Sequence, residues 1–358
     1  MFKFKIDIPL FIGLMILCSV SLFILWSAGG ESQRLLFNQS VRMGVAILAM
    51  LAIAQVRPET LFRVSPVLFG IGLVMLLLVL LVGYTGKGAQ RWLDLGFMRF
   101  QPSELMKIAV PMMVSWVLTR KPLPPSAGNL SLATAVLVAP AILILKQPDL
   151  GTTILIVMSG GLILFLAGFA WKLIGVLAGA SVVAIPFAYH FLLHPYQQKR
   201  IQTLFDPWAD PLGAGYHIIQ SMIAIGSGGS QGKGWMAGSQ SQLEFIPERH
   251  TDFIFSVFAE EQGFLGFLFL LLLYLLITLR GLYIAYYTKD TFSRLVAGSL
   301  SMTFFFYVFV NIGMVSGMLP VVGVPLPLIS YGGTSMVTLM AGFGILMSIH
   351  HHRSLMSR

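Results

Sequence analysis

Long apolar stretches alternate with short polar breaks along the whole chain. A stretch of about 20 mostly apolar residues is long enough to cross a lipid bilayer as a helix, and ten such stretches can be traced. Their approximate ranges are 8–28, 38–56, 64–84, 105–119, 130–146, 151–169, 172–194, 253–279, 292–316 and 330–349. This pattern predicts an all-α integral membrane protein in which residues 1–358 form a single polytopic domain.

Two of the polar breaks are longer than the others, at 85–104 and at 195–252. The second lies between the seventh and eighth predicted spans. Within it, residues 216–225 mix apolar and polar side chains in a way that suits a helix lying along the membrane surface. Asp206 and Asp210 each precede a proline, which predicts turns in which the Asp side chain accepts a hydrogen bond.

The composition supports a membrane protein. Only 10% of the 358 residues are charged and 56% are hydrophobic, whereas a soluble domain carries roughly 25% charged residues. The first apolar run continues to Trp26 without a small-residue cleavage site, unlike a cleaved signal peptide. The single cysteine, Cys18, cannot form an internal disulfide. Basic residues at cytoplasmic loop ends explain the net charge of +9 better than nucleic-acid binding does.

An even number of spans places both chain ends on one side of the membrane. When the long segment 195–252 is set aside, more basic residues fall on the side of the termini than on the other, which favours a cytoplasmic location for that side. Among the acidic residues, only Asp7, Glu59 and Asp290 fall there. We therefore expect both termini in the cytoplasm, segment 195–252 outside, and the chemistry on the outer face.

Two motifs resemble ligand sites but have simpler interpretations. The glycine-rich stretch 226–234 lacks the spacing of a P-loop and is interpreted first as a flexible turn, although its backbone N–H groups and Lys233 could contact a lipid pyrophosphate. His190 and His194 have the spacing of a helical metal pair, but no third ligand is close in sequence. The run 350–352 is interpreted as an interfacial tail, so no metal site is predicted.

Glu104 and Lys107 open the otherwise apolar stretch 105–119. Their spacing of three residues places both side chains on one helix face. Ionisable groups at membrane depth are costly and commonly belong to functional sites. An ion pair that only neutralises itself at the mouth of the helix is an equal alternative on these grounds.

Ionisable residues also cluster where segment 195–252 meets the eighth predicted span. Thr and Asp are favoured helix N-caps, so capping alone could account for Thr251 or Asp252. Capping does not account for the other charged residues nearby, which are Glu248, Arg249, His250, Glu260 and Glu261. A site and a cap are equal alternatives for Asp252 from the residue pattern.

Several long motifs occur together along the chain. They are Arg91-Trp-Leu-Asp-Leu95, Gln101-Pro-Ser-Glu-Leu105, Gln147-Pro-Asp-Leu-Gly-Thr152, Asp210-Pro-Leu-Gly-Ala-Gly-Tyr-His217, Asn311-Ile-Gly-Met-Val-Ser-Gly-Met-Leu-Pro320 and Val324-Pro-Leu-Pro-Leu-Ile-Ser330-Tyr-Gly-Gly-Thr-Ser335. Through them the chain resembles, over nearly its whole length, the SEDS family of shape, elongation, division and sporulation proteins. The Glu-Arg-His of 248–250 is similar to the elongation member, since the division member typically has Glu-Ala-His.

The resemblance implies a ten-helix fold in the bacterial cytoplasmic membrane and a peptidoglycan glycosyltransferase. Its substrate would be lipid II, an undecaprenyl-pyrophosphate-linked disaccharide-pentapeptide, polymerised into glycan strands on the outer face during cell elongation. The family's essential aspartate corresponds to Asp252, and its companion glutamate and lysine correspond to Glu104 and Lys107.

The resemblance also implies partners. These are a class B penicillin-binding protein, which crosslinks the strands, and other proteins of the elongation complex. Helix contacts in lipid depend on close packing of small residues. Segments 253–279 and 292–316 carry such residues, which are Gly263, Gly266, Gly298 and Ser301. We therefore expect the partner's single membrane helix against these two segments, with further contacts to segment 195–252.

The implied reaction assigns a role to each residue. A hydroxyl of the acceptor sugar attacks the donor's anomeric carbon, which requires a general base and positive charge near the leaving pyrophosphate. We predict Asp252 as the base and Glu104 as the group that orients Lys107 or the acceptor. The predicted pyrophosphate ligands, in falling order, are Lys107, Arg249, Arg200 and Lys233. A divalent cation, Mg or Mn, held by Asp252 is an open alternative to the base.

Two other functions stay open. A transporter that flips lipid II would also need many helices, charges inside the membrane and a lipid substrate, although the duplicated halves of many transporters are not evident. A non-catalytic scaffold for the crosslinking enzyme is the third reading.

Overall fold

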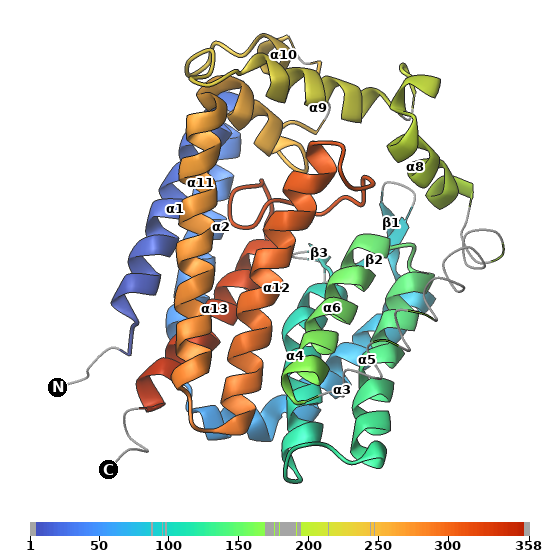
Figure 1. Cartoon of the computed structure of the whole chain (residues 1–358), viewed down its shortest axis with the longest axis vertical. Coiled ribbons are helices and arrows are strands. Elements are labelled where there is room, and N and C mark those ends of the chain that lie inside the picture. The colour runs from blue at the N-terminus through green and yellow to red at the C-terminus, as the bar shows by residue number, and fades with distance from the viewer. Residues whose placement is uncertain are drawn as a thin grey trace.

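The computed structural model describes residues 5–353, apart from 87–88, 95, 97–98, 169–174, 176–178, 180–190, 192–194, 214, 244 and 247. Nine long helices run roughly parallel within this part of the chain (Figure 1). They are α1 (Ile8–Ala28), α2 (Gln33–Ala54), α3 (Pro58–Val82), α4 (Pro102–Thr119), α5 (Ala127–Lys146), α6 (Leu150–Leu166), α11 (Ile254–Tyr287), α12 (Thr291–Val315) and α13 (Thr334–Arg353).

Each of these helices coincides with one of the ten predicted spans. The predicted span 172–194 lies outside the described residues except at 175, 179 and 191, and His190 and His194 are among the residues outside. Six of the described helices are long and apolar enough to cross a membrane, namely α1, α2, α3, α5, α11 and α12, and α6 is a shorter apolar helix. The chain is a helical membrane protein.

The helix starts follow local capping chemistry. The Asp7 side chain accepts a hydrogen bond from Leu10 N at the start of α1, and Ser32 caps α2 in the same way. Asp149 accepts from Thr152 N at the start of α6. Short polar side chains are preferred at these positions because they satisfy backbone N–H groups that have no partner within the helix.

A small sheet in the break at 85–104 was not predicted. Strands β1 (Tyr84–Gly86), β2 (Ala89–Asp94) and β3 (Arg99–Phe100) pair antiparallel in the order β1-β2-β3. The longest strand, β2, has the sequence AQRWLD, which does not alternate between apolar and polar residues, so the usual strand pattern is absent. The sheet leads the chain from α3 into α4, and the fold class of the membrane domain is all-helical as expected.

Segment 195–252 forms short helices over one end of the bundle (Figure 1). They are α8 (Pro195–Phe205), the 3₁₀ turn η1 (Pro207–Ala209), α9 (Tyr216–Ser227) and α10 (Ser239–Gln242). Helix α9 agrees with the helix expected at 216–225, and it lies across the end of the bundle. The start of α1 and the end of α13 lie at the opposite end.

Helix α11 differs from the continuous span predicted at 253–279. At Gly263 the backbone leaves the helical region, with φ 64° and ψ −159°, so two helical segments follow one another. A positive φ of this kind is accessible to glycine without steric cost. The first segment follows directly after Asp252 in the chain.

Polar side chains pair at the end of the bundle where α1 begins. Arg280 Nη2 lies 2.6 Å from Asp7 Oδ2, and His350 Nε2 lies 3.2 Å from the same oxygen. Lys5 Nζ lies 2.9 Å from His352 Nε2. Within the described part of the chain no group of three or more His, Cys, Asp or Glu side chains could hold a metal ion.

Two hydrophobic cores meet near the middle of the bundle. The larger one draws its side chains mainly from α1, α2, α11, α12 and α13, and the second draws them mainly from α3, α4, α5 and α6. Helix α12 packs against both sides. The polar groups described next line the junction between the two cores.

Candidate active site

Polar side chains from several helix starts line one cavity of about 410 Å³. Glu104 and Lys107 come from the first turns of α4, and Asp252 comes from the turn before α11. Other wall residues come from β2, α6, α12 and the segment before α13. Residues 148 positions apart in the sequence therefore line the same cavity.

Glu104 and Lys107 form a buried ion pair. Lys107 Nζ lies 2.6 Å from Glu104 Oε1, and the two residues are only 8% and 5% exposed. The Lys107 ammonium also lies 4.9 Å from the ring centre of Tyr307, which is an attractive arrangement for a cation. The second carboxylate oxygen of Glu104 has no hydrogen-bond partner in the described structure, so it can accept one from a ligand.

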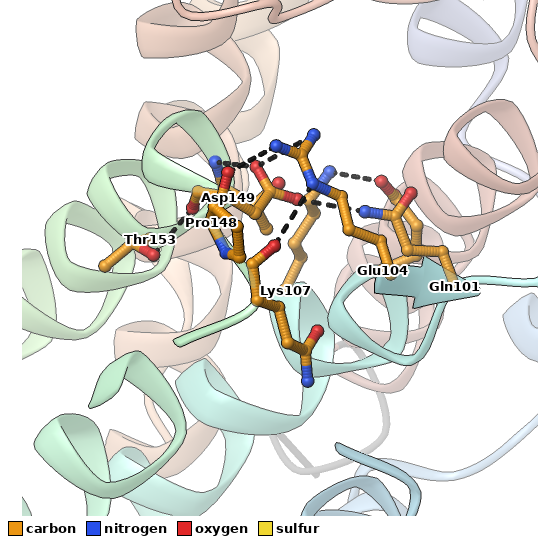
Figure 2. Close-up of polar contacts among 9 residues, drawn as sticks. Gln101, Glu104, Lys107, Pro148, Asp149 and Thr153 are labelled. Atoms are coloured by element: carbon orange, nitrogen blue, oxygen red, sulfur yellow. Dashed lines mark hydrogen bonds and ion pairs between the residues drawn. The ribbon is translucent and has the colours of Figure 1, made fainter. Parts of the chain in front are cut away.

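A second acidic group lines the cavity beside this pair (Figure 2). Gln101 Nε2 donates to Asp149 Oδ2 at 3.1 Å, and Arg91 Nη1 lies 3.9 Å from Asp149 Oδ1. Arg91 also donates to the backbone oxygens of Gln147 and Pro148. Two family motifs for which the sequence analysis predicted no chemical role, 91–95 and 147–152, thus contribute to the wall of the cavity that Asp252 also lines.

Asp149 could have been identified from the sequence as a candidate site residue. A carboxylate at the start of the predicted span 151–169 is costly at membrane depth for the same reason as Glu104. Arg91 lies in a polar break, where basic residues are common, so its pattern carried no comparable signal.

The turn that carries Asp252 is held by backbone contacts. The N-cap of α11 is Phe253, and no side-chain hydrogen bond caps this helix. Capping therefore does not account for Asp252. Asn311 Nδ2 donates to Asp252 O at 3.0 Å, and Tyr331 N donates to His250 O at 2.9 Å.

A second cavity of about 390 Å³ begins on the other side of Asp252. Asp252, Glu248 and Gly323 line both cavities. Arg200 of α8 and His217 of α9 line only the second one. Burial lowers the pKa of the His217 imidazole below its ordinary value of 6.5, although the nearby Glu248 charge acts in the opposite direction. Near neutral pH the His217 side chain in the wall of this cavity is therefore an uncharged imidazole.

Two of the predicted cationic ligands lie elsewhere. The Arg249 guanidinium donates to Ser241 O, and Lys233 Nζ lies 2.8 Å from Glu260 Oε1. Neither residue is among the described residues that line the two cavities. Of the four predicted cations, the cavities bring Lys107 and Arg200 together with Asp252.

This arrangement defines a helical membrane protein with a charged, two-sided cavity at one end of its bundle. Residues 1–355 match the model of the Cell cycle protein family that is named for FtsW, RodA and SpoVE. The chain belongs to this family, to which its motifs had pointed. The resemblance to the elongation member, RodA, is confirmed by the relatives below.

Similar proteins cover nearly the whole chain. Peptidoglycan glycosyltransferase MrdB of Escherichia coli K12 is 51% identical over 356 residues, which are 99% of this chain and 96% of that protein. The probable peptidoglycan glycosyltransferase FtsW of Idiomarina loihiensis is 36% identical over 332 residues, covering 90% of this chain and 80% of its own length.

Solved structures share the fold. A chain from a structure of a peptidoglycan synthase complex, titled for its coordination of polymerization and crosslinking, has a TM-score of 0.85 at 34% identity, with 97% of this chain and 98% of that chain covered. The crystal structure of RodA from Thermus thermophilus has a TM-score of 0.73 at 29% identity, with 97% of both chains covered.

Proposed function

We propose that the protein is a peptidoglycan glycosyltransferase that polymerises lipid II into glycan strands during cell elongation. One observation carries the proposal: a single cavity gathers Asp252, Glu104 and Lys107. Identity of 51% with the Escherichia coli enzyme, over nearly all of both chains, supports the same activity.

The site faces the outside of the bacterial cytoplasmic membrane in this proposal, and both termini are cytoplasmic. The arrangement of the elements supports this orientation, because α8, α9 and α10 lie at one end of the bundle and the chain enters α1 and leaves α13 at the other (Figure 1). The turn before α11 lines both cavities, and α8 lines the second one, so they lie at the end proposed to be extracytoplasmic.

Asp252 acts as the general base. Its carboxylate takes the proton of the acceptor hydroxyl while that oxygen forms the new glycosidic bond to the donor's anomeric carbon. The bond from this carbon to undecaprenyl pyrophosphate breaks, and the pyrophosphate leaves with the electron pair. A base that lines two cavities suits a reaction that must bring two lipid-linked sugars together.

Positive charge is available on both sides of the base. Lys107 lines the larger cavity and Arg200 lines the second, so each cavity combines one predicted pyrophosphate ligand with Asp252. Charge stabilisation of this kind is strong in a site that excludes water. The Glu104 carboxylate holds the Lys107 ammonium in place through the 2.6 Å contact.

A divalent cation is not part of this mechanism. The described residues do not form a protein metal site of three or more ligands, so an Mg or Mn ion would need oxygen atoms of the substrate as additional ligands. None of the proposed steps requires such an ion.

The proposed partner is a class B penicillin-binding protein, together with other proteins of the elongation complex. The similarity to a chain from a peptidoglycan synthase complex supports a crosslinking partner. The expected contact through small residues is revised at two positions. Ser301 is 1% exposed and packs beside Gly281. A Cβ at Gly298 would lie 3.0 Å from Leu166, so this position already packs against α6. The outward face of α11 takes their place in the proposal.

Purified protein in liposomes with labelled lipid II tests the function. We expect glycan strands, and we expect none from the Asp252→Asn variant. Movement of lipid II across the bilayer without polymer formation would instead identify a flippase. Absence of both activities would identify a non-catalytic scaffold. The charged cavity beside Asp252 favours the enzyme among these three.

A further inference from the structure

The glycine-rich loop 228–234 fills the break in α11. Four backbone hydrogen bonds of 2.9–3.1 Å replace those that the helix loses around Gly263. They join Lys233 N to Glu260 O, Gly234 N to Glu261 O, Phe264 N to Gly229 O and Leu265 N to Ser230 O. Backbone groups at a helix break need such partners when they are buried, so the loop and the helix form one unit.

Close backbone approach explains the glycines of this loop. A Cβ atom at Gly232 would lie 2.1 Å from Glu261 O, and one at Gly228 would lie 2.1 Å from Ala259 O. Both distances are far below ordinary contact, so a side chain at either position would force the loop away from α11. The glycines of the stretch 226–234 therefore have a structural explanation that does not require phosphate binding.

The Glu260 carboxylate fixes the chain that follows the loop. Glu260 is fully buried. It accepts hydrogen bonds from Lys233 Nζ at 2.8 Å, from Gln240 N at 2.9 Å and from Ser241 N at 3.2 Å. A buried carboxylate needs a cation and several donors to offset its lost hydration, and Lys233 with the start of α10 supplies them.

The backbone groups of Ser241 connect Glu260 to Arg249. Its N–H donates to Glu260 Oε2, and its carbonyl oxygen accepts from Arg249 Nη1. Arg249 precedes Asp252 by three residues, and Glu260 follows it by eight. The hydrogen bonds and the chain 249–260 thus close a ring that contains Asp252.

We propose that Arg249 and Glu260 are positioning residues that fix the turn of Asp252 through Ser241, with Lys233 neutralising Glu260. This inference rests on the proposed function, because Asp252 is taken as the base. It replaces the expectation that Arg249 and Lys233 contact the pyrophosphate directly. A misplacement of a catalytic group by about 1 Å can cost two orders of magnitude in rate, so the ring acts on turnover rather than on substrate affinity.

A double-mutant cycle on lipid II polymerisation tests this assignment. Arg249→Met and Glu260→Gln should each lower kcat by about tenfold or more and leave KM within about twofold. The double variant should be no slower than the slower single variant, because both changes open the same ring. Arg249→Lys, which keeps a donor for Ser241 O, should recover part of the lost turnover.

Ligand binding by Arg249 predicts a different pattern. In that case Arg249→Met would raise KM for lipid II at nearly constant kcat, and its effect would add to that of Glu260→Gln. This result would overturn the proposal. Lys289→Met removes an exposed cation at the end of α11 far from the ring, and it should change neither constant.

A labelling experiment tests the ring without enzymatic activity. The Asp252→Cys protein, with Cys18 replaced by Ala, carries one thiol at the turn. Adding Arg249→Met or Glu260→Gln should change the rate of thiol modification by at least about threefold, since a released turn samples more conformations. Equal rates in correctly folded variants would refute positioning, whereas inactivity of the unchanged protein towards lipid II would refute only the proposed function.

Discussion

The Ser330 hydroxyl lies 2.7 Å from the carbonyl oxygen of Thr251, although 79 residues separate them in the chain. Ser330 donates this hydrogen bond and accepts another from Leu326 N at 2.8 Å. The late motif 324–335 is therefore fastened to the turn that carries Asp252. One role of this segment is therefore to hold the backbone beside the proposed base through the Ser330 hydroxyl.

Replacing Ser330 by alanine should weaken both the fold and the site. The partly buried Thr251 O and the buried Leu326 N would each lose a partner, and an unsatisfied buried group costs about 1–3 kcal/mol. We expect a lower thermal midpoint in detergent and a slower polymerisation of lipid II. Ser40→Ala is a matched control because Ser40 is exposed and donates to Leu36 O in its own helix. Equal effects of the two substitutions would contradict the assignment.

Asp252→Asn should abolish polymerisation while the protein stays stable. The amide keeps the size of the side chain but cannot take a proton from the acceptor hydroxyl. Helix α11 has Phe253 as its N-cap without a side-chain bond, so the change should not remove a cap, whose loss typically costs about 1 kcal/mol. Product gels and thermal unfolding measure the two properties. A well-folded Asp252→Asn protein with near-normal activity would exclude Asp252 as the base.

The pair of Glu104 and Lys107 allows structure and activity to be separated. Lys107→Met leaves the Glu104 carboxylate buried without its cation, which should cost about 3–5 kcal/mol. The double variant Glu104→Gln with Lys107→Met removes both charges, so most of that stability should return. Polymerisation should stay lost in both proteins, because neither has the ammonium that lines the cavity with Asp252. Measurements of unfolding and of glycan yield on the same samples check this.

Recovery of activity in the double variant would show that the pair is structural. The residue pattern alone left these two interpretations equal. Burial of both groups in the wall of the cavity that Asp252 also lines favours the functional one, and the double variant decides between them.

The sequence allowed prediction of features that depend on local pattern. Apolar length located nine of the described helices, and the spacing of Glu104 and Lys107 predicted their contact. Asp252 was recognised from a motif and from crowding of charges. The break at Gly263 was missed because the apolar pattern continues through it without change.

Other features depend on contacts between distant segments. Lys233 and Arg249 carry the charges expected of pyrophosphate ligands, and nothing near them in sequence reveals that Glu260 and Ser241 bind them. The sheet at 84–100 was missed because its longest strand, β2, does not alternate between apolar and polar residues. Hydrogen bonds across long separations leave no periodic signal, so only the folded chain shows them.

The Asp7 carboxylate should make stability depend on pH. Burial by itself would raise the pKa of this group, but hydrogen bonds from Arg280 and Leu10 N and the charges of His350 and Arg280 lower it below the ordinary 3.8. The stabilisation is therefore complete above about pH 3.8 and is lost as the pH falls through the pKa of the folded protein.

Asp7→Asn tests this dependence. The amide retains the capping oxygen for α1 but loses the charge, so unfolding at pH 7 should become easier by about 1.5–3 kcal/mol. The difference from the unchanged protein should shrink steadily below pH 3.8. Asp290→Asn is the matched control, since Asp290 caps α12 in the same way. A difference that does not vary with pH would show that the charge of Asp7 is not responsible.

The outward face of α11 should contact the membrane helix of the crosslinking partner. This face carries a row of exposed apolar side chains at helical spacing, which are Leu265, Leu268, Leu272, Leu276 and Leu279. Lipid tails are as apolar as leucine, so the contact must come from close packing. Gly266 lies beside this row on the same helix and is partly exposed. A backbone can approach closely there.

Disulfide crosslinking between single cysteines in α11 and in the partner's helix measures the contact. The buried native thiol is first removed by Cys18→Ala. Leu268→Cys should crosslink strongly, because its side chain belongs to the exposed row. Ile142→Cys in α5 has similar exposure, at 50% against 42% for Leu268, and should give only background. Strong crosslinks from position 142, with none from position 268, would place the partner on the other side of the bundle.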